Sequence, residues 1–363
     1  MEKPIRMTSS PTTARGPKSF ALLSAVLVIG ISLYLSRFSV APAPATAATD
    51  QQKSDTVTAQ AVAAADAFLN ALDANQRKQA VYDFDSARKS GWSNLPARIV
   101  PRNGVRLGDL TKAQRSLAMD AIAAVLSKSG YQKIVDIVDA DQRLADEAGG
   151  RGAMFGADQY YLAFFGKPSA TQPWMLQFGG HHLGLNVSVI GKNFVLTPTH
   201  TGAQPAVFKL DGKVVRPLGR ENDSAVKLIN ALDEKQRAQA IIGERPQGEM
   251  LLGPGRDGRT IEPRGIKGSA LTTDQQAMLL DVIAAWVNML KPDDASTRMA
   301  SIKSNISDAY FAWKGPTTKG SAAYFRVQGP TVVIEYAPQG STDHIHTVIR
   351  DPTDDYGTGL LKR

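Results

Sequence analysis

The chain has 363 residues, 43% of them hydrophobic, which is the composition of a folded protein with a substantial core. Residues 1–48 carry five basic side chains and one acidic side chain, so this segment accounts for +4 of the net charge of +8. The remainder has no basic run and no interleaved aromatic stripe, so we expect no nucleic-acid partner. Cysteine is absent, which excludes disulfides, thiolate metal sites and cysteine nucleophiles. Any metal must therefore be held by histidine, carboxylate or carbonyl ligands.

The first 48 residues have the pattern of an export signal. A basic segment is followed by the apolar run 20–35 and then by Ala45-Thr46-Ala47, which fits a small-residue cleavage site. The apolar run is also close to the length that spans a bilayer, so a retained signal anchor is the alternative to a cleaved signal. In both cases the basic residues stay inside, and we expect a periplasmic or other extracytoplasmic body whose membrane contact is this segment.

The rest of the chain contains an internal duplication. The segment 70–80, with the sequence NALDANQRKQA, recurs at 230–240 as NALDEKQRAQA. Parts of the segment 110–124 recur at 271–285, in the same order and at nearly the same spacing. Two motifs that recur in this way indicate that both halves share one structural plan.

Each half is predicted to begin with helices and to end with strands. Thr111 and Thr272, each followed three residues later by Gln, form capping-box patterns that open a helix in each half. Short apolar runs bounded by Gly, Pro and Asp then predict four strands per half, joined by tight turns. The predicted strands are 160–165, 174–178, 183–190 and 194–197 in the first half, and 310–313, 323–327, 331–336 and 344–349 in the second.

These elements predict an α+β fold made of two pseudo-symmetric repeats, each a helical part followed by an antiparallel β-meander. The first repeat is expected to span residues 49–218 and to carry a Gly-His-His motif. The second is expected to span residues 219–363 and to carry a His-x-His motif. Such repeats would associate most economically around a pseudo-two-fold axis.

Four of the five histidines lie in these two motifs. Strand alternation points His344 and His346 to the same face, so that both can bind one metal ion. His181 and His182 are neighbours and should face opposite sides, unless Gly179-Gly180 forms a bulge that reorients them. We predict that one imidazole of the first pair lies close to His344 and His346.

A metal centre built from these four histidines would suit Zn²⁺, Cu or Fe, because imidazole is a good ligand for these metals whereas Mg²⁺ and Ca²⁺ prefer oxygen. Protonation of the ligands below about pH 6 would then release the metal. Arg350 and Asp351 follow on the same predicted strand. They are candidates for a catalytic role, in which one of them orients a substrate or a bound water.

The structural alternative is that the histidines only form hydrogen bonds. Histidines in strands commonly bond to carboxylates or backbone groups, and Asp343, Asp351, Asp354 and Asp355 lie nearby in the sequence. The fifth histidine, His200, stands alone at the end of a predicted strand and is predicted to be a surface residue.

These motifs resemble the uncharacterised family catalogued as domain of unknown function 3500. The resemblance is carried by Gly180-His181-His182-Leu183 with Asn186 downstream, by the Asn-Ala-Leu-Asp-x-x-Gln-Arg opening and by residues 344–357. It covers nearly everything after about residue 56, and implies an exported or membrane-associated protein of mostly bacterial distribution with no established activity. The family motifs mark positions without assigning roles to them; these positions are His181, His182, His344, His346, Arg350, Asp351 and Tyr356.

Two classes of function remain open. The first is an exported or membrane-anchored metal-dependent enzyme, hydrolytic or oxidative, with a His-rich site built from both repeats. The second is a non-catalytic extracytoplasmic binding or scaffold protein, in which aromatic strand residues present a surface to a small-molecule or protein partner and the histidines are structural. Metal analysis of the purified protein distinguishes the two classes.

Overall fold

The computed structural model describes residues 45–362, and these residues form a mixed α+β fold. The α+β class predicted from the sequence is confirmed. The export signal or anchor predicted for residues 1–48 lies outside the described part of the chain, except for its last residues. Within the described part, no helix is both long enough and apolar enough to cross a membrane.

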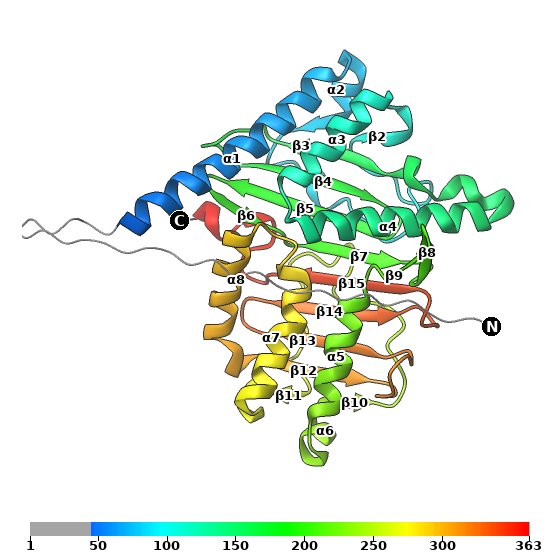
Figure 1. Ribbon diagram of the computed structural model, residues 1–363, viewed down its shortest axis with the longest axis vertical. Helices are drawn as coiled ribbons and strands as arrows, with labels where there is room; N and C mark the ends of the chain where they lie inside the picture. The colour runs from blue at the N-terminus through cyan, green and yellow to red at the C-terminus, as the bar shows by residue number, and fades with distance from the viewer. Residues whose placement is uncertain (1–44, 363) are drawn as a thin grey trace, which may run out of the picture. The chain divides into compact units, whose positions relative to one another are not determined.

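A mixed sheet of thirteen strands organises the described residues (Figure 1). Its order is β1-β3-β4-β5-β7-β15-β14-β13-β12-β10, and β2, β6 and β11 pair beside this path with β3, β5 and β12. A separate hairpin is formed by β8 and β9. The strands are β1 Val81–Tyr82, β2 Val105–Arg106, β3 Tyr161–Phe165, β4 Trp174–Gly180, β5 Leu183–Ile190, β6 Asn193–Val195, β7 Thr199–Ala203, β8 Phe208–Leu210, β9 Lys213–Val215, β10 Ile241–Gly243, β11 Ile266–Lys267, β12 Tyr310–Lys314, β13 Tyr324–Gln328, β14 Val333–Pro338 and β15 Ile345–Arg350.

The two meanders meet at an antiparallel pair in the middle of the sheet, β7 with β15. In its register Thr199 pairs with Ile349 and Ala203 pairs with Ile345. The prediction that residues 194–197 form the fourth strand of the first meander is wrong. Residues 193–195 form β6, a short partner of β5, and β7 takes the place beside β15. The error arose because β7 has the polar sequence THTGA, which lacks the apolar run by which the other strands were recognised.

Helices pack on one face of this sheet (Figure 1). One continuous core joins helix residues such as Phe68, Ile122 and Ile283 to strand residues such as Phe178 and Phe311. The helices are α1 Ala45–Ala71, α2 Ala74–Ala80, α3 Lys112–Ala124, α4 Lys128–Glu147, α5 Gly219–Ala231, α6 Glu234–Ala240, α7 Thr273–Val287 and α8 Pro292–Ser304.

The helix starts predicted at Thr111 and Thr272 are confirmed, since these residues cap α3 and α7. Asp73 and Asp233 cap α2 and α6 in the same way. In each case the glutamine at the third helical position bonds back to the backbone N–H of the capping residue. These reciprocal bonds satisfy backbone groups that a helix end otherwise leaves without partners.

The opposite face of the sheet is covered by two long connections, residues 83–104 and 244–265, whose backbone bonds to strand side chains at Lys89, Leu252 and Ile261. Strand alternation decides which residues of β15 reach this face: Ile345 and Ile349 join the core under the helices, whereas Val348 joins a smaller core formed with residues of the connections. His346 and Arg350 are each two residues from Val348, so their side chains lie on the same face of β15 as Val348. The face of β15 that carries His346 and Arg350 is therefore buried under loops and not under helices. The smaller core consists of Trp92, Met250, Tyr324, Ala337 and Val348.

Candidate metal centre

His181 and His182 form the two-residue turn between β4 and β5. Gly180 pairs with Leu183 across this turn, and His182 has a φ of +61°. The expectation that the two histidines face opposite sides is wrong, because it assumes a regular strand and the pair has already left the strand. Their ring centroids lie only 3.5 Å apart. The turn is fastened to β7 by the N–H of Gly202, which donates to the His182 carbonyl at 2.7 Å.

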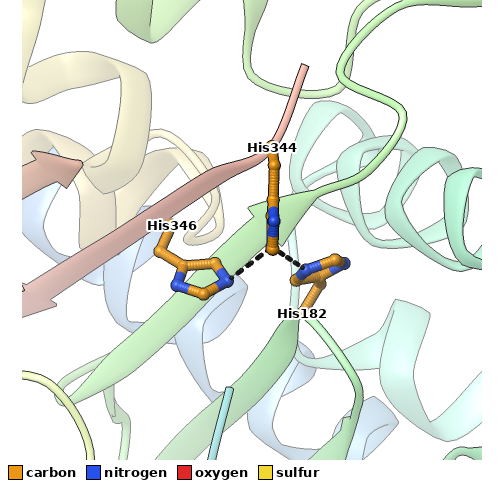
Figure 2. Close-up of side chains that lie close together, drawn as sticks. All are labelled: His182, His344 and His346. Carbon is orange, nitrogen blue, oxygen red and sulfur yellow. Dashed lines mark hydrogen bonds between the residues drawn. The ribbon is translucent and has the colours of Figure 1, made fainter. Parts of the chain in front are cut away.

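Three imidazoles converge at this turn (Figure 2). The Nε2 atom of His182 lies 2.9 Å from Nε2 of His344, and Nε2 of His344 lies 3.1 Å from Nε2 of His346. His182 and His346 are buried, and His344 is partly buried. The structure thus brings together one member of the first histidine pair and both members of the second, across more than 160 residues of sequence.

Two of the three nitrogen–nitrogen spacings are close to those between ligands on one metal ion, and all three nitrogens lie within 4.8 Å of one another. Nitrogens bound to a tetrahedral Zn²⁺ at about 2.0–2.1 Å lie about 3.3 Å from one another, and the observed contacts are only a few tenths of an ångström shorter. Without an ion, the single Nε2 of His344 must serve both contacts as donor or acceptor. An ion placed among the three lone pairs satisfies all of them.

Burial keeps His182 and His344 in the neutral form that binds metal. Desolvation, reinforced by the neighbouring histidines, holds the pKa of His182 well below its ordinary value of 6.5. The same causes lower the pKa of His344 to about 4. Both rings are therefore unprotonated at neutral pH and can ligate a metal without first losing a proton.

The outer nitrogen of His346 has a carboxylate within reach. Nδ1 lies 3.4 Å from both oxygens of Glu249 and 3.1 Å from the Asn94 amide nitrogen, which itself donates to Glu249 at 3.1 Å. Metal binding through Nε2 requires the tautomer with its proton on Nδ1, in which His346 donates to Glu249 and the Asn94 amide donates to Glu249 alone. Burial would raise the pKa of Glu249, but its hydrogen bond to His346 and its other partners hold the pKa below its ordinary value. Its side chain is 49% exposed, so this carboxylate also reaches solvent.

A second group of potential ligands adjoins the first. His181 Nδ1 lies 2.6 Å from Asp141 Oδ1, on the buried face of α4, and the other Asp141 oxygen accepts the N–H of Gly156 at 3.0 Å. The position of His181 is fixed from a further side by Tyr160, whose hydroxyl donates to the His181 carbonyl at 2.7 Å. Ligand atoms of Asp141, His181 and His182 lie within 4.8 Å of one another, and all three residues are buried.

The sequence matches the model of a family described as a protein of unknown function, DUF3500, over residues 54–358. The chain belongs to this family. No curated protein and no solved structure gave a match. What can be said of this DUF3500 protein's chemistry therefore comes from its own side chains, and its buried His and Asp clusters could bind a metal.

The prediction that His200 is a surface residue is wrong. It is fully buried on β7, its Nδ1 lies 2.8 Å from the Thr347 carbonyl, and its ring lies 5.4 Å from that of His346. Its Nε2 is buried and has no hydrogen-bond partner among the described residues. Desolvation, followed by the charge of His346, holds the pKa of His200 well below its ordinary value. No local pattern marks this location, because it depends on the pairing of β7 with β15.

Arg350 and Asp351 lie outside the imidazole cluster of this DUF3500 protein. Arg350 donates through Nε to the Leu252 carbonyl at 2.7 Å and forms ion pairs with Asp355 at 2.8 Å and Asp257 at 2.9 Å. Asp351 forms an ion pair with Arg298 at 2.6 Å. These contacts fasten loops to the end of β15, and none of them joins an imidazole. A catalytic role for the two residues stays a prediction.

Sequence reasoning missed three residues beside the histidines: Asp141, Asn94 and Glu249. Asp141 had a detectable signal, because it continues the buried stripe of α4 through Ile134, Ile137 and Val138, where a charged residue is unexpected. Asn94 and Glu249 lie in the irregular connections, whose path over the sheet has no periodic pattern in the sequence.

Proposed function

We propose that this DUF3500 protein is a metal-dependent enzyme whose ion is held by His182, His344 and His346. The observation that carries this proposal is the convergence of three Nε2 atoms at 2.9 Å and 3.1 Å from two segments far apart in the sequence. Structural zinc sites have four protein ligands, whereas catalytic sites have three and leave one position for water or substrate. Three imidazoles, one of them only partly buried, match the catalytic pattern.

The chemistry best supported by this ligand set is hydrolysis. Zn²⁺ suits neutral imidazoles and lowers the pKa of a bound water to about 7, which makes it a nucleophile at neutral pH. The protein's part is to keep His182 and His344 neutral by burial and to orient His346 through Glu249. The half-exposed Glu249 carboxylate also stands where a proton can pass to solvent. An oxidative reaction is the alternative if the bound metal is copper, which three imidazoles also accommodate.

The test is elemental analysis and metal titration of the purified full chain. We expect bound Zn²⁺ or Cu in the wild type and its loss in His344→Ala and His346→Ala. His200→Asn is a matched control, because it removes a buried imidazole that is not a ligand while its amide can still donate to the Thr347 carbonyl. Wild-type protein that contains no metal and binds neither added Zn²⁺ nor Cu²⁺ would favour the non-catalytic binding or scaffold function.

We also infer that the body is a duplicated unit, with repeats 49–218 and 219–363 related by a pseudo-two-fold axis between β7 and β15. The strand registers support this inference. Tyr161 of β3 pairs with Gly179 of β4, and adding 149 to both residue numbers gives Tyr310 and Gln328, which pair in β12 and β13. The same offset converts the pair Phe178–Leu185 into Val327–Ile334. Both outer edges also repeat a parallel pairing, β1 with β3 and β10 with β12.

Side-chain contacts support the same duplication. The capping glutamines of α2 and α3, Gln76 and Gln114, bond to each other at 2.9 Å, and Gln236 and Gln275 of α6 and α7 do so at 2.8 Å. An experimental structure checks the inference. If segments 161–190 and 310–338 cannot be superposed with a single offset, the duplication is wrong.

Finally, we propose that the body functions outside the cytoplasm, exported or anchored by residues 1–48. The support is the sequence pattern of that segment, a basic stretch followed by an apolar run and an Ala-Thr-Ala site. A reporter that is active only in the cytoplasm, fused to the C-terminus, is expected to be silent. Strong reporter activity would contradict this localisation.

A further inference from the structure

We propose that a second metal ion binds on the other side of the His182 ring, held by Asp141, His181 and Nδ1 of His182. The imidazole of His182 would then bridge two ions, one on each nitrogen. This inference rests on the proposed function, since it takes the centre formed by His182, His344 and His346 as the first site. It adds a dinuclear centre to the mononuclear one.

The ligand atoms of the second site are already close together. Asp141 Oδ1 lies 2.6 Å from Nδ1 of His181 and 3.9 Å from Nδ1 of His182. All three side chains are at least nine-tenths buried, with exposed fractions of 0% for Asp141, 7% for His181 and 1% for His182. The set of one carboxylate and two imidazoles is a common one for Zn²⁺ and other transition metals.

The independent observation is the unpaired nitrogen of His182. Its Nδ1 is buried and has no hydrogen-bond partner among the described residues, although Nε2 of the same ring faces His344 at 2.9 Å. Buried polar atoms without a partner are rare in proteins because they forfeit the hydrogen bonds they had in water. An ion beside Nδ1 gives this atom the partner that the protein does not supply.

Charge also favours an ion beside Asp141. One Asp141 oxygen accepts the N–H of Gly156 at 3.0 Å, so the ligand would be Oδ1, which without an ion contacts His181 Nδ1 at 2.6 Å. A carboxylate and a deprotonated bridging imidazole together supply two negative charges. They offset the repulsion between two divalent cations on opposite sides of one ring, which a neutral bridge would not do.

The proton balance of the second binding step is defined. When both nitrogens of His182 bind ions, the ring must lose its one remaining N–H proton, which passes to solvent. The proton that His181 Nδ1 shares with Asp141 moves to Nε2 of the same ring, because Nδ1 then coordinates the ion. Binding of the second ion therefore releases one proton to solvent, the remaining N–H proton of His182.

The experiment is titration of the metal-free full chain with Zn²⁺ and, separately, with Cu²⁺, followed by elemental analysis. We expect two ions per chain in the wild type and one in both Asp141→Asn and His181→Ala. His344→Ala should remove the ion of the first site and leave the second site's ligands intact. Asp139→Asn is a matched control, since this carboxylate lies on the same helix two residues earlier and belongs to neither group; it should keep both ions.

Electron paramagnetic resonance of the Cu²⁺-loaded protein gives a readout that loss of structure cannot imitate. Two Cu²⁺ ions joined by one imidazolate couple magnetically, so the wild-type signal should be strongly reduced relative to its copper content. The signal of Asp141→Asn should instead account for all of its single copper. Circular dichroism of each variant verifies folding.

The outcomes separate the two proposals. Wild-type protein that binds one ion per chain, with the same stoichiometry in Asp141→Asn, would overturn the second site and leave the first intact. Two ions per chain with a full, uncoupled copper signal would overturn the bridge. Wild-type protein that binds no ion would instead overturn the proposed function.

Discussion

Two polar clusters lie on the loop-covered face of the central sheet, one at each end of β15. At its start, His344 and His346 meet His182 across the β4–β5 turn. At its end, Arg350 meets two aspartates and two backbone carbonyls. Trp92 lies between the clusters, with its ring 6.4 Å from that of His200 and 5.5 Å from the Arg350 guanidinium carbon.

The two clusters differ in how completely their polar atoms are satisfied. All three guanidinium nitrogens of Arg350 donate to oxygen acceptors, and its positive charge is matched by Asp257 and Asp355. In the histidine cluster, His182 Nδ1 is buried without a hydrogen-bond partner among the described residues. Such an orphaned atom is expected mainly where a ligand or a reaction supplies the partner. The arginine cluster is thus explained by structure alone, and the histidine cluster is not.

The largest effect is expected from breaking the satisfied cluster. Arg350→Ala leaves Asp257 and Asp355 without their cation, and loss of one partner of a buried ion pair costs about 3–5 kcal/mol of unfolding free energy. The metal content of the folded protein should be unchanged. Denaturant unfolding and elemental analysis measure the two quantities. The exposed pair Arg216–Asp223 offers a control, because Arg216→Ala should cost no more than about 1 kcal/mol.

The opposite pattern is expected for the histidine cluster. His344→Ala removes one of three proposed ligands, and its metal affinity should fall by more than about 100-fold, since even changes behind the ligands cost 10–100-fold. Its metal-free stability should change little, because His344 is only partly buried. Competition with a chromophoric chelator measures the affinity. Equal metal affinity of wild type and His344→Ala would show that His344 is not a ligand, and the proposed difference between the two ends of β15 would be wrong.

The parts of the fold that the sequence predicted are those controlled by local chemistry. The capping boxes at Thr111 and Thr272 are satisfied within one helical turn, so their pattern of Thr followed by Gln is sufficient to locate α3 and α7. The alternation that sets His344 and His346 on one side also lies within one segment.

The parts that the sequence did not predict depend on pairing across the chain. β7 is polar, and it is held as a strand by β5 on one side and β15 on the other, so no local pattern marks it. His200 was therefore placed on the surface. Asn94 and Glu249 reach His346 through irregular connections, whose course is decided by the sheet they cover.

A smaller effect is expected from the residue behind His346. Glu249→Gln removes the carboxylate that accepts a proton from His346 Nδ1, so the preference for a free Nε2 weakens. Metal affinity should fall by about 10–100-fold without loss of the site. Glu244→Gln, an exposed residue of the same connection, is the control and should bind as the wild type does. If Glu249→Gln binds metal as tightly as the control, Glu249 does not orient His346.

The comparison between the two clusters also predicts a pH dependence, because only the histidine cluster contains groups with lowered pKa values. The pKa of His344 is about 4 in the folded protein and that of His182 is also well below 6.5, the ordinary value that both regain on unfolding. Between pH 6.5 and about 4, the unfolded chain therefore binds more protons than the folded one. The unfolding free energy of the metal-free protein should fall as the pH decreases through this window.

The same shifts extend metal binding to lower pH. Ordinary histidines would be protonated below about pH 6 and would release the ion there, as the sequence alone predicted. Because burial lowers the pKa of His344 to about 4, the ion should instead remain bound near pH 5 and leave as the pH approaches 4. Equilibrium dialysis against Zn²⁺ from pH 7 to 4 measures the release. Arg350→Ala should follow the wild-type release curve, since its guanidinium contacts no imidazole. Release of half the metal at pH 6 or above would show that the imidazoles are not desolvated as the structure indicates.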